Sequence, residues 1–151
     1  MAAQGDNVVE NPRSGERVEF VSETSETLTM LTTWTRPGHR AAEHIHPDME
    51  ERFEVLEGRA AFLVDGVEVV AAAGEVVVVR PRSRHRGWNP TDAPVRLKIE
   101  MRPGLRWAEF TRRFCRGDDP VQLLHEYNAE VVLPPATSVP HRGNLRPQAD
   151  A

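Results

Sequence analysis

Apolar and polar residues alternate along most of residues 17–101, in short runs that turn-forming residues separate. In VRLKIEM (95–101) the apolar side chains occupy every second position, which is typical of a β-strand with one buried face. Asp65 and Gly66 stand between two apolar runs and predict a two-residue hairpin turn. Turn signals recur about every 8–12 residues, a spacing that favours a β-barrel or a β-sandwich.

The pattern changes to helical spacing after this region. Segments 105–114 and 120–132 contain good helix formers and predict two helices. An aspartate, Asp118 or Asp119, immediately before Pro120 predicts the start of the second helix, because aspartate caps helices and proline is favoured at their first position.

The chain of 151 residues fits a single domain. We expect four parts: an N-terminal arm (1–15), a barrel (16–103), C-terminal helices packed on the barrel (104–133) and a flexible tail (134–151). A formal net charge of -4 argues against a nucleic-acid or membrane partner. Cys115, the single cysteine, excludes an intramolecular disulfide. We see no signal peptide and no apolar run that could span a membrane, and we expect a cytoplasmic protein.

His44 and His46 lie two positions apart just before an alternating segment. On an extended chain such residues point to the same side, so both imidazoles can converge on one point. Imidazole is a good ligand for iron, manganese, nickel, copper and zinc. Taken alone, such a pair near a turn is more often solvated or hydrogen-bonded than bound to a metal.

Two adjacent glutamates, Glu50 and Glu51, follow this pair. If Glu51 faces the barrel interior, the apolar Phe53 faces it too. If Glu50 faces the interior instead, Arg52 and Glu54 enter with it as unpaired charges, which is costly. The period of two therefore selects Glu51 as the inward carboxylate.

His85 is a further candidate ligand, because it follows a run of four valines and a turn. A histidine at the start of the next strand would complete a site of three imidazoles and one carboxylate. Such a set leaves positions open on a five- or six-coordinate metal, which a catalytic site needs.

The spacing of these residues resembles the first motif of the cupin family. The segment GHRAAEHIHPDMEERFEVLEG (38–58) has a glycine, a His-x-His pair, a glutamate and a closing glycine at the positions that the motif requires. These residues are Gly38, His44, His46, Glu51 and Gly58.

The segment GEVVVVRPRSRHRGWN resembles the second cupin motif. Gly74 opens it, His85 occupies the position of the last metal ligand, and Asn89 closes it. This chain departs from the motif twice: Arg80 stands where the family usually has proline, and Arg82 stands at the turn glycine.

The resemblance implies an all-β fold, a cupin double-stranded β-helix (jelly-roll) barrel with short C-terminal helices. It implies one divalent transition metal per chain (Fe, Mn, Ni or Zn), bound by His44, His46, Glu51 and His85. The segment RPGLRWAEF resembles the end of small single-domain bacterial cupins. Such cupins act as dioxygenases, isomerases or cyclases on small molecules, some of them in secondary metabolism.

Four residues near the expected site are candidates for contact with a substrate: Phe53, Arg80, Trp88 and Trp34. Aromatic residues in strands usually fill the core, although Phe53 shares the parity of Glu51. Arg80 begins an alternation of arginines at 80, 82, 84 and 86, of which one could anchor an anionic group. A solvated basic loop is the more usual role. The aromatic residues of 105–114 have the spacing of packing residues.

The valines of 76–79 are apolar on both faces of their strand, and outward apolar residues need a cover. The cover would be the C-terminal helices or a second copy of the chain, and the resemblance implies a homodimer. We expect a metal-dependent enzyme that acts on a small organic substrate inside the barrel. The alternative is a non-catalytic cupin that binds a small ligand.

Overall fold

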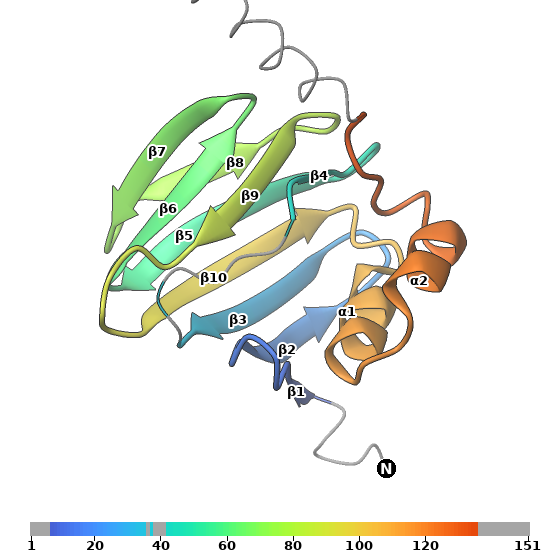
Figure 1. Cartoon of the computed structure of the whole chain (residues 1–151), viewed down its shortest axis with the longest axis horizontal. Helices are drawn as coiled ribbons and strands as arrows, with labels where there is room; N and C mark the ends of the chain where they lie inside the picture. The colour runs from blue at the N-terminus through green and yellow to red at the C-terminus, as the bar shows by residue number, and fades with distance from the viewer. Residues whose placement is uncertain (1–6, 36, 38–41, 136–151) are drawn as a thin grey trace, which may run out of the picture.

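The structure is a computed structural model that describes residues 7–35, 37 and 42–135. Most of the expected tail, the start of the expected arm and Gly38 lie outside the described residues. Two antiparallel sheets face each other and enclose the core, with two helices at one side (Figure 1). The prediction of an all-β barrel followed by short helices is confirmed.

The larger sheet has six strands in the order β1-β2-β3-β10-β5-β8. The strands are β1 (Val8–Glu10), β2 (Arg17–Glu23), β3 (Leu28–Trp34), β5 (Glu50–Glu57), β8 (Val76–Val79) and β10 (Val95–Arg102). β1 pairs with β2, so part of the expected N-terminal arm is an edge strand of this sheet.

The alternation of apolar and charged residues that predicts β10 matches the burial of its side chains. Val95, Leu97, Ile99 and Met101 are buried, and the charged residues between them are only half-buried. β10 lies between β3 and β5 and pairs with both.

The smaller sheet has four strands in the order β4-β9-β6-β7. The strands are β4 (His44–Ile45), β6 (Arg59–Val64), β7 (Val67–Ala72) and β9 (Arg84–Trp88). Asp65 and Gly66 join β6 to β7 with φ angles of 48° and 84°, which is the left-handed backbone of the predicted hairpin turn. β4 pairs with β9, and this register places His44 opposite His85.

The helices are α1 (Trp107–Cys115) and α2 (Pro120–Glu126). Asp119 caps α2, and its side chain accepts a hydrogen bond from the backbone N–H of Val121. The prediction of a helix to residue 132 is wrong, because the chain becomes extended after a turn and Val132 pairs with Ile45 through two backbone hydrogen bonds of 2.9 Å. Neither helix of the described chain has the length or apolar character to cross a membrane.

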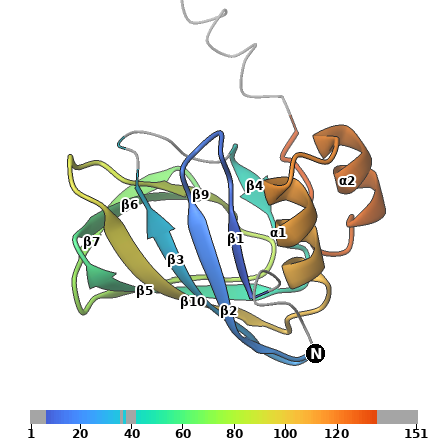
Figure 2. The same cartoon turned by 90° about the horizontal axis from the view of Figure 1, so that it is seen from below.

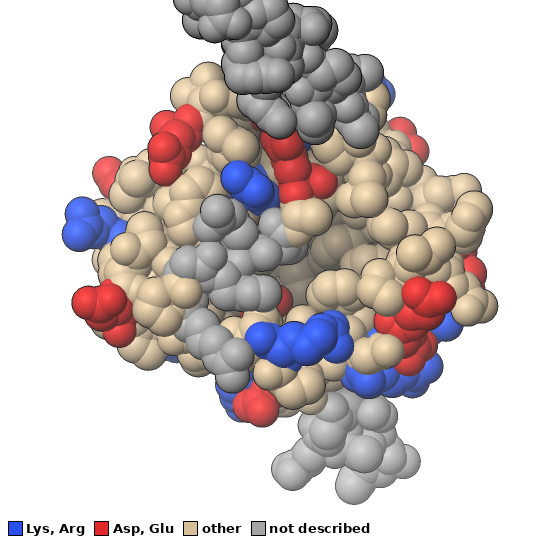
Figure 3. All heavy atoms as spheres, in the orientation of Figure 1, with Lys and Arg blue, Asp and Glu red and all other residues tan. Residues whose placement is uncertain are grey.

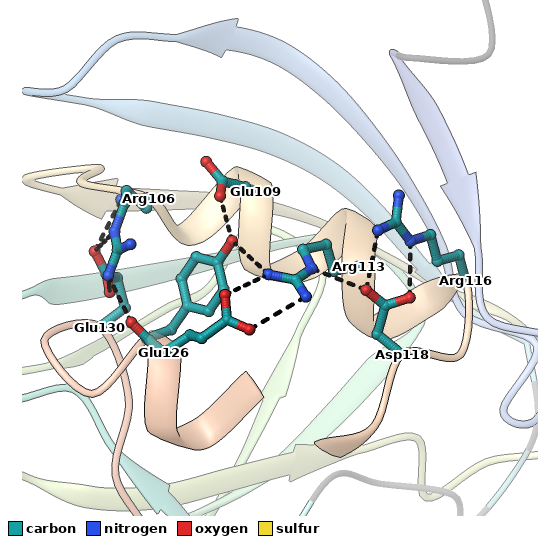
Figure 4. Close-up of polar contacts among 8 residues, drawn as sticks. Arg106, Glu109, Arg113, Arg116, Asp118, Glu126 and Glu130 are labelled. Carbon is teal, nitrogen blue, oxygen red and sulfur yellow. Dashed lines mark hydrogen bonds and ion pairs between the residues drawn. The ribbon is translucent and has the colours of Figure 1, made fainter. Parts of the chain in front are cut away.

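A network of ion pairs joins the two helices (Figure 4). Arg113 of α1 forms ion pairs with Asp118 and with Glu126 of α2. The hydroxyl group of Tyr127 donates a hydrogen bond to Glu109. Exposed pairs of this kind contribute little individually, but together they fix the orientation of α2 relative to α1. Figures 1 and 2 both place the helix pair beside β1 and away from β7.

Candidate metal centre and cavity

The four predicted ligands come together at one point between the two sheets. His44 and His46 come from β4 and the residue after it, Glu51 from β5 and His85 from β9. Their candidate ligand atoms all lie within 4.8 Å of one another. Oε1 of Glu51 lies 3.1 Å from Nε2 of His46 and 3.0 Å from Nε2 of His85. Glu50 is not part of this cluster.

Backbone carbonyl groups orient all three imidazoles. Nδ1 of His46 donates to the carbonyl oxygen of Glu130 at 2.8 Å, and Nδ1 of His44 donates to that of Ala42 at 2.8 Å. Nδ1 of His85 lies 3.3 Å from the carbonyl oxygen of Ser83. These contacts leave Nε2 of each ring free to bind a metal, an arrangement that is typical of metal-binding histidines.

The electrostatics of the cluster suit a metal cation. Burial and the neighbouring His85 and His46 lower the pKa of His44 to about 3, so this ring is neutral. Burial acts to raise the pKa of Glu51, but hydrogen bonds from His46 and His85 outweigh it and hold that pKa below its usual range. A neutral imidazole and an ionised carboxylate are the forms that bind metals.

The donor set fits one divalent transition metal. Three imidazole nitrogens and one carboxylate oxygen suit iron, manganese, nickel or zinc. His46 and His85 are each 1% exposed and Glu51 is 6% exposed, so a metal here would be shielded from bulk water. Four protein ligands leave coordination positions open for a substrate.

Metal binding is expected to release a proton from His85 at pH values where a free histidine is already neutral. Burial acts to lower the pKa of His85, but the hydrogen bond and charge of Glu51 outweigh it and raise that pKa. The metal-free protein therefore keeps a proton on His85 at pH values where a free histidine has lost it, and the metal displaces this proton. Apparent affinity should rise with pH until the metal-free protein itself loses the proton. Calorimetric zinc titrations in buffers of different ionisation enthalpy measure the release, and buffer-independent heats at neutral pH would contradict it.

The turn before β9 keeps its shape without the family's glycine. Arg82 has a φ of 73°, a left-handed conformation that favours glycine. Its backbone N–H donates to the carbonyl oxygen of His46 at 2.8 Å, which ties the turn to the ligand segment. Arg82 thus adopts a backbone conformation that glycine adopts more easily than other residues.

A cavity of about 490 Å³ opens beside the cluster. His44, Glu51 and His85 form part of its wall, and most of the remaining wall is apolar or aromatic. The face of the molecule in Figure 3 is hollowed near its centre. A volume of this size accommodates a small organic molecule.

Two of the four predicted substrate residues line this cavity. Trp34 and Phe53 form part of its wall. Arg80 is exposed, Trp88 is half-buried, and neither is among the described residues that line the cavity. The structure thus brings the aromatic strand residues to the candidate site but leaves the arginine outside.

The helix α1 contributes to the cavity in a way that the sequence did not indicate. Trp107, Phe110 and Phe114 line the cavity, although their helical spacing predicts packing residues. The ring of Trp107 lies 4.7 Å from that of His46 and 6.4 Å from that of His44, measured between centroids. The helical spacing of these aromatic residues was visible in the sequence, but which surface they cover depends on where the helix docks.

Glu16 and Thr32 also line the cavity, and sequence reasoning missed both. Thr32 shares a strand face with Trp34, so strand parity alone could have placed it inward. Glu16 precedes its strand, where no periodic pattern indicates the direction of a side chain.

Comparison with known proteins agrees with this fold. Residues 35–101 match the family model of the cupin domain. The chain therefore contains a domain of the cupin superfamily.

Two curated relatives come from streptomycetes. The chain is similar to the polyketide synthase CurC of Streptomyces cyaneus, with 35% identity over 45% of this chain and 44% of that protein. It is also similar to the tetracenomycin polyketide synthase protein TcmJ of Streptomyces glaucescens, with 31% identity over 44% of this chain and 45% of that protein. The matches thus span less than half the length of these relatives.

Solved structures share the fold at low sequence identity. KdgF from Halomonas sp. superposes with a TM-score of 0.58 and 13% identity, over 67% of this chain and 90% of that chain. An RmlC-like cupin from Shewanella frigidimarina superposes with a TM-score of 0.57 and 21% identity, over 68% of this chain and 89% of that chain.

Proposed function

We propose that this protein is a metal-dependent enzyme that transforms a small, flat, largely apolar organic molecule bound inside the barrel. The observation that carries this proposal is that a cluster of three histidines and one glutamate forms part of the wall of an aromatic cavity. The similarity to two proteins described as polyketide synthase components supports a polyketide-derived substrate, and hence a role in secondary metabolism.

One group of residues would bind the metal and another would bind the substrate. His44, His46, Glu51 and His85 would hold the metal, which would polarise a carbonyl oxygen or activate dioxygen. Trp34, Phe53 and Trp107 would pack against the rings of the substrate and exclude water from the reacting end. The reaction is then an oxygenation or a Lewis-acid isomerisation or cyclisation.

Product analysis under air and under nitrogen tests this function. Metal-loaded protein is incubated with a panel of phenolic naphthalenes and linear β-polyketones, and the products are identified by mass spectrometry. We expect turnover that chelation and the His85→Ala substitution both abolish. A mass gain from dioxygen that disappears under nitrogen indicates oxygenation, whereas an isomeric or dehydrated product under both gases indicates Lewis-acid chemistry. Tight binding with no product in either atmosphere contradicts the enzyme and favours the non-catalytic ligand-binding alternative.

We also propose that the chain forms a cytoplasmic homodimer through the outer faces of β7 and β8. Val70, Val76 and Val78 are 41–53% exposed on these strands, and α1 and α2 lie at another side of the barrel (Figure 1). Exposed apolar patches on a sheet favour association. Light scattering of the purified protein tests this, and a monomeric mass contradicts it.

A further inference from the structure

Glu16 places an acidic group in the wall of the cavity. It lies immediately before β2 and lines the cavity. Its Oε2 atom accepts a hydrogen bond from Nε1 of Trp34 at 3.1 Å. Within the described part of the chain no arginine or lysine forms an ion pair with it. The carboxyl group therefore has an oxygen atom available for another partner.

Thr32 supplies a second polar group in the same wall. Its side chain is 2% exposed, it lines the cavity, and its hydroxyl oxygen has no hydrogen-bond partner among the described residues. Buried hydroxyl groups without a partner are rare, because desolvation without a hydrogen bond is costly. A polar group of a bound molecule would satisfy this hydroxyl group.

An aromatic row connects the candidate metal ligands to Glu16. Between ring centroids, His85 lies 6.4 Å from Phe53, Phe53 lies 4.7 Å from Phe62, and Phe62 lies 6.0 Å from Trp34. Trp34 then donates its hydrogen bond to Glu16. Phe53 and Trp34 of this row line the cavity, so flat aromatic surfaces lie between the metal cluster and Glu16, and the fully buried Phe62 packs against both rings.

Gly87 leaves room for the rings of Trp34 and Phe62. A Cβ atom at position 87 would lie 2.8 Å from the Trp34 ring and 3.1 Å from the Phe62 ring. The absence of a side chain therefore lets the indole of Trp34 occupy this position, from which its N–H group reaches Glu16.

Glu16 can act as an acceptor or as a donor near neutral pH. Burial raises its pKa to about 7, with a contribution from Glu51 and against the hydrogen bond from Trp34. The other charged and titratable groups around it are Arg13 in the preceding turn, Cys115 on α1 and the histidines of the metal cluster. Above about pH 7 the carboxylate accepts a hydrogen bond from a hydroxyl group.

We propose that the Glu16 carboxyl group and the Thr32 hydroxyl group bind a hydroxyl group of a flat aromatic substrate whose other end reaches the metal cluster. This inference rests on the proposed function, and it specifies the substrate as a phenolic aromatic molecule with a second oxygen substituent at its far end. Glu16 then selects phenols over their ethers, because an ether has no proton for a carboxylate to accept.

Binding of two probes to metal-free protein tests this role. The dissociation constants of 2-naphthol and 2-methoxynaphthalene are measured at about pH 8 by calorimetry. We expect wild-type protein to prefer the naphthol by about tenfold or more, since hydrogen bonds to charged groups are the stronger ones. In Glu16→Gln the amide still accepts from Trp34, but its NH2 group donates equally well to either probe, so the preference should fall to within about twofold of unity.

The pH profile separates binding by Glu16 from a structural role. In wild-type protein the preference should shrink as pH falls through about 7, because the protonated carboxyl group donates to either probe. In Glu16→Gln it should be small and independent of pH. Glu19→Gln is the matched control, because Glu19 lies on β2 but outside the cavity lining and should keep the wild-type preference.

The test is independent of the metal, so it can fail separately from the proposed function. Elemental analysis of Glu16→Gln should give the wild-type metal content. An unchanged preference in Glu16→Gln, a wild-type protein that binds both probes equally, or no naphthol binding by wild-type protein would each overturn the role of Glu16.

Discussion

His46→Ala is expected to lower the affinity for divalent metal at least about 100-fold, the upper end of what loss of a mere supporting contact costs a metal site. His46 is 1% exposed, and the Glu130 carbonyl group aims its Nε2 atom at Glu51. Its removal deletes one of four ligands and leaves a cavity in their place. The three remaining ligands bind a metal much less tightly than the complete set of four.

Competition with a chromophoric chelator measures this affinity for zinc and for manganese. His125→Ala is the matched control, because His125 is exposed on α2 and takes no part in the cluster. Circular dichroism establishes that both variants fold. An affinity for His46→Ala within about threefold of wild type would show that the metal, if any, binds elsewhere.

Phe62→Ala is expected to lower the free energy of unfolding by about 3–5 kcal/mol, the usual cost of truncating a buried phenylalanine. Phe62 is fully buried on β6 and lies between the rings of Phe53 and Trp34. The deletion removes the apolar contacts of a whole ring and leaves a cavity that the surrounding strands cannot fill without moving.

Urea denaturation of metal-free protein measures this loss. Val67→Ala is the control, because Val67 is 62% exposed and its truncation should change stability by no more than about 0.5 kcal/mol. A loss below about 1 kcal/mol for Phe62→Ala would mean that the barrel interior is not packed around this ring as described.

The sequence predicted best what depends on local periodicity. The alternation in residues 95–101 gave both the strand and its buried face, and the Asp65-Gly66 pair gave the hairpin. The same rule placed Glu51 rather than Glu50 in the cluster. These predictions succeed because the pleat of a strand fixes the direction of each side chain from its neighbours alone.

Features that depend on tertiary docking could not be predicted in the same way. The helical pattern of residues 105–114 predicted α1 but not that Trp107 would contact the imidazoles of the cluster. The extended pairing of Val132 with Ile45 overrode the helical pattern, because the edge of β4 offers backbone partners that a short helix end does not. The prediction that Arg80 contacts the substrate rested on the arginines of its turn. Their presence does not determine which way the turn faces.

Elements from distant parts of the chain meet at the candidate metal cluster. The pairing of β4 with β9 positions two histidines, and β5 adds the carboxylate. The segment after α2 fixes a third ring through the Glu130 carbonyl group. Arg106 at the start of α1 binds the buried carboxylate of Glu130, so the helices also support the cluster.

The metal content of the purified protein decides whether the cluster of three histidines and one glutamate is a metal site. Elemental analysis of wild-type protein and of His44→Ala, as isolated and after reconstitution, counts the metal ions per chain. We expect about one divalent transition metal ion per wild-type chain and a large loss in His44→Ala. Less than about 0.2 metal ion per wild-type chain, with no uptake on reconstitution, would contradict the account.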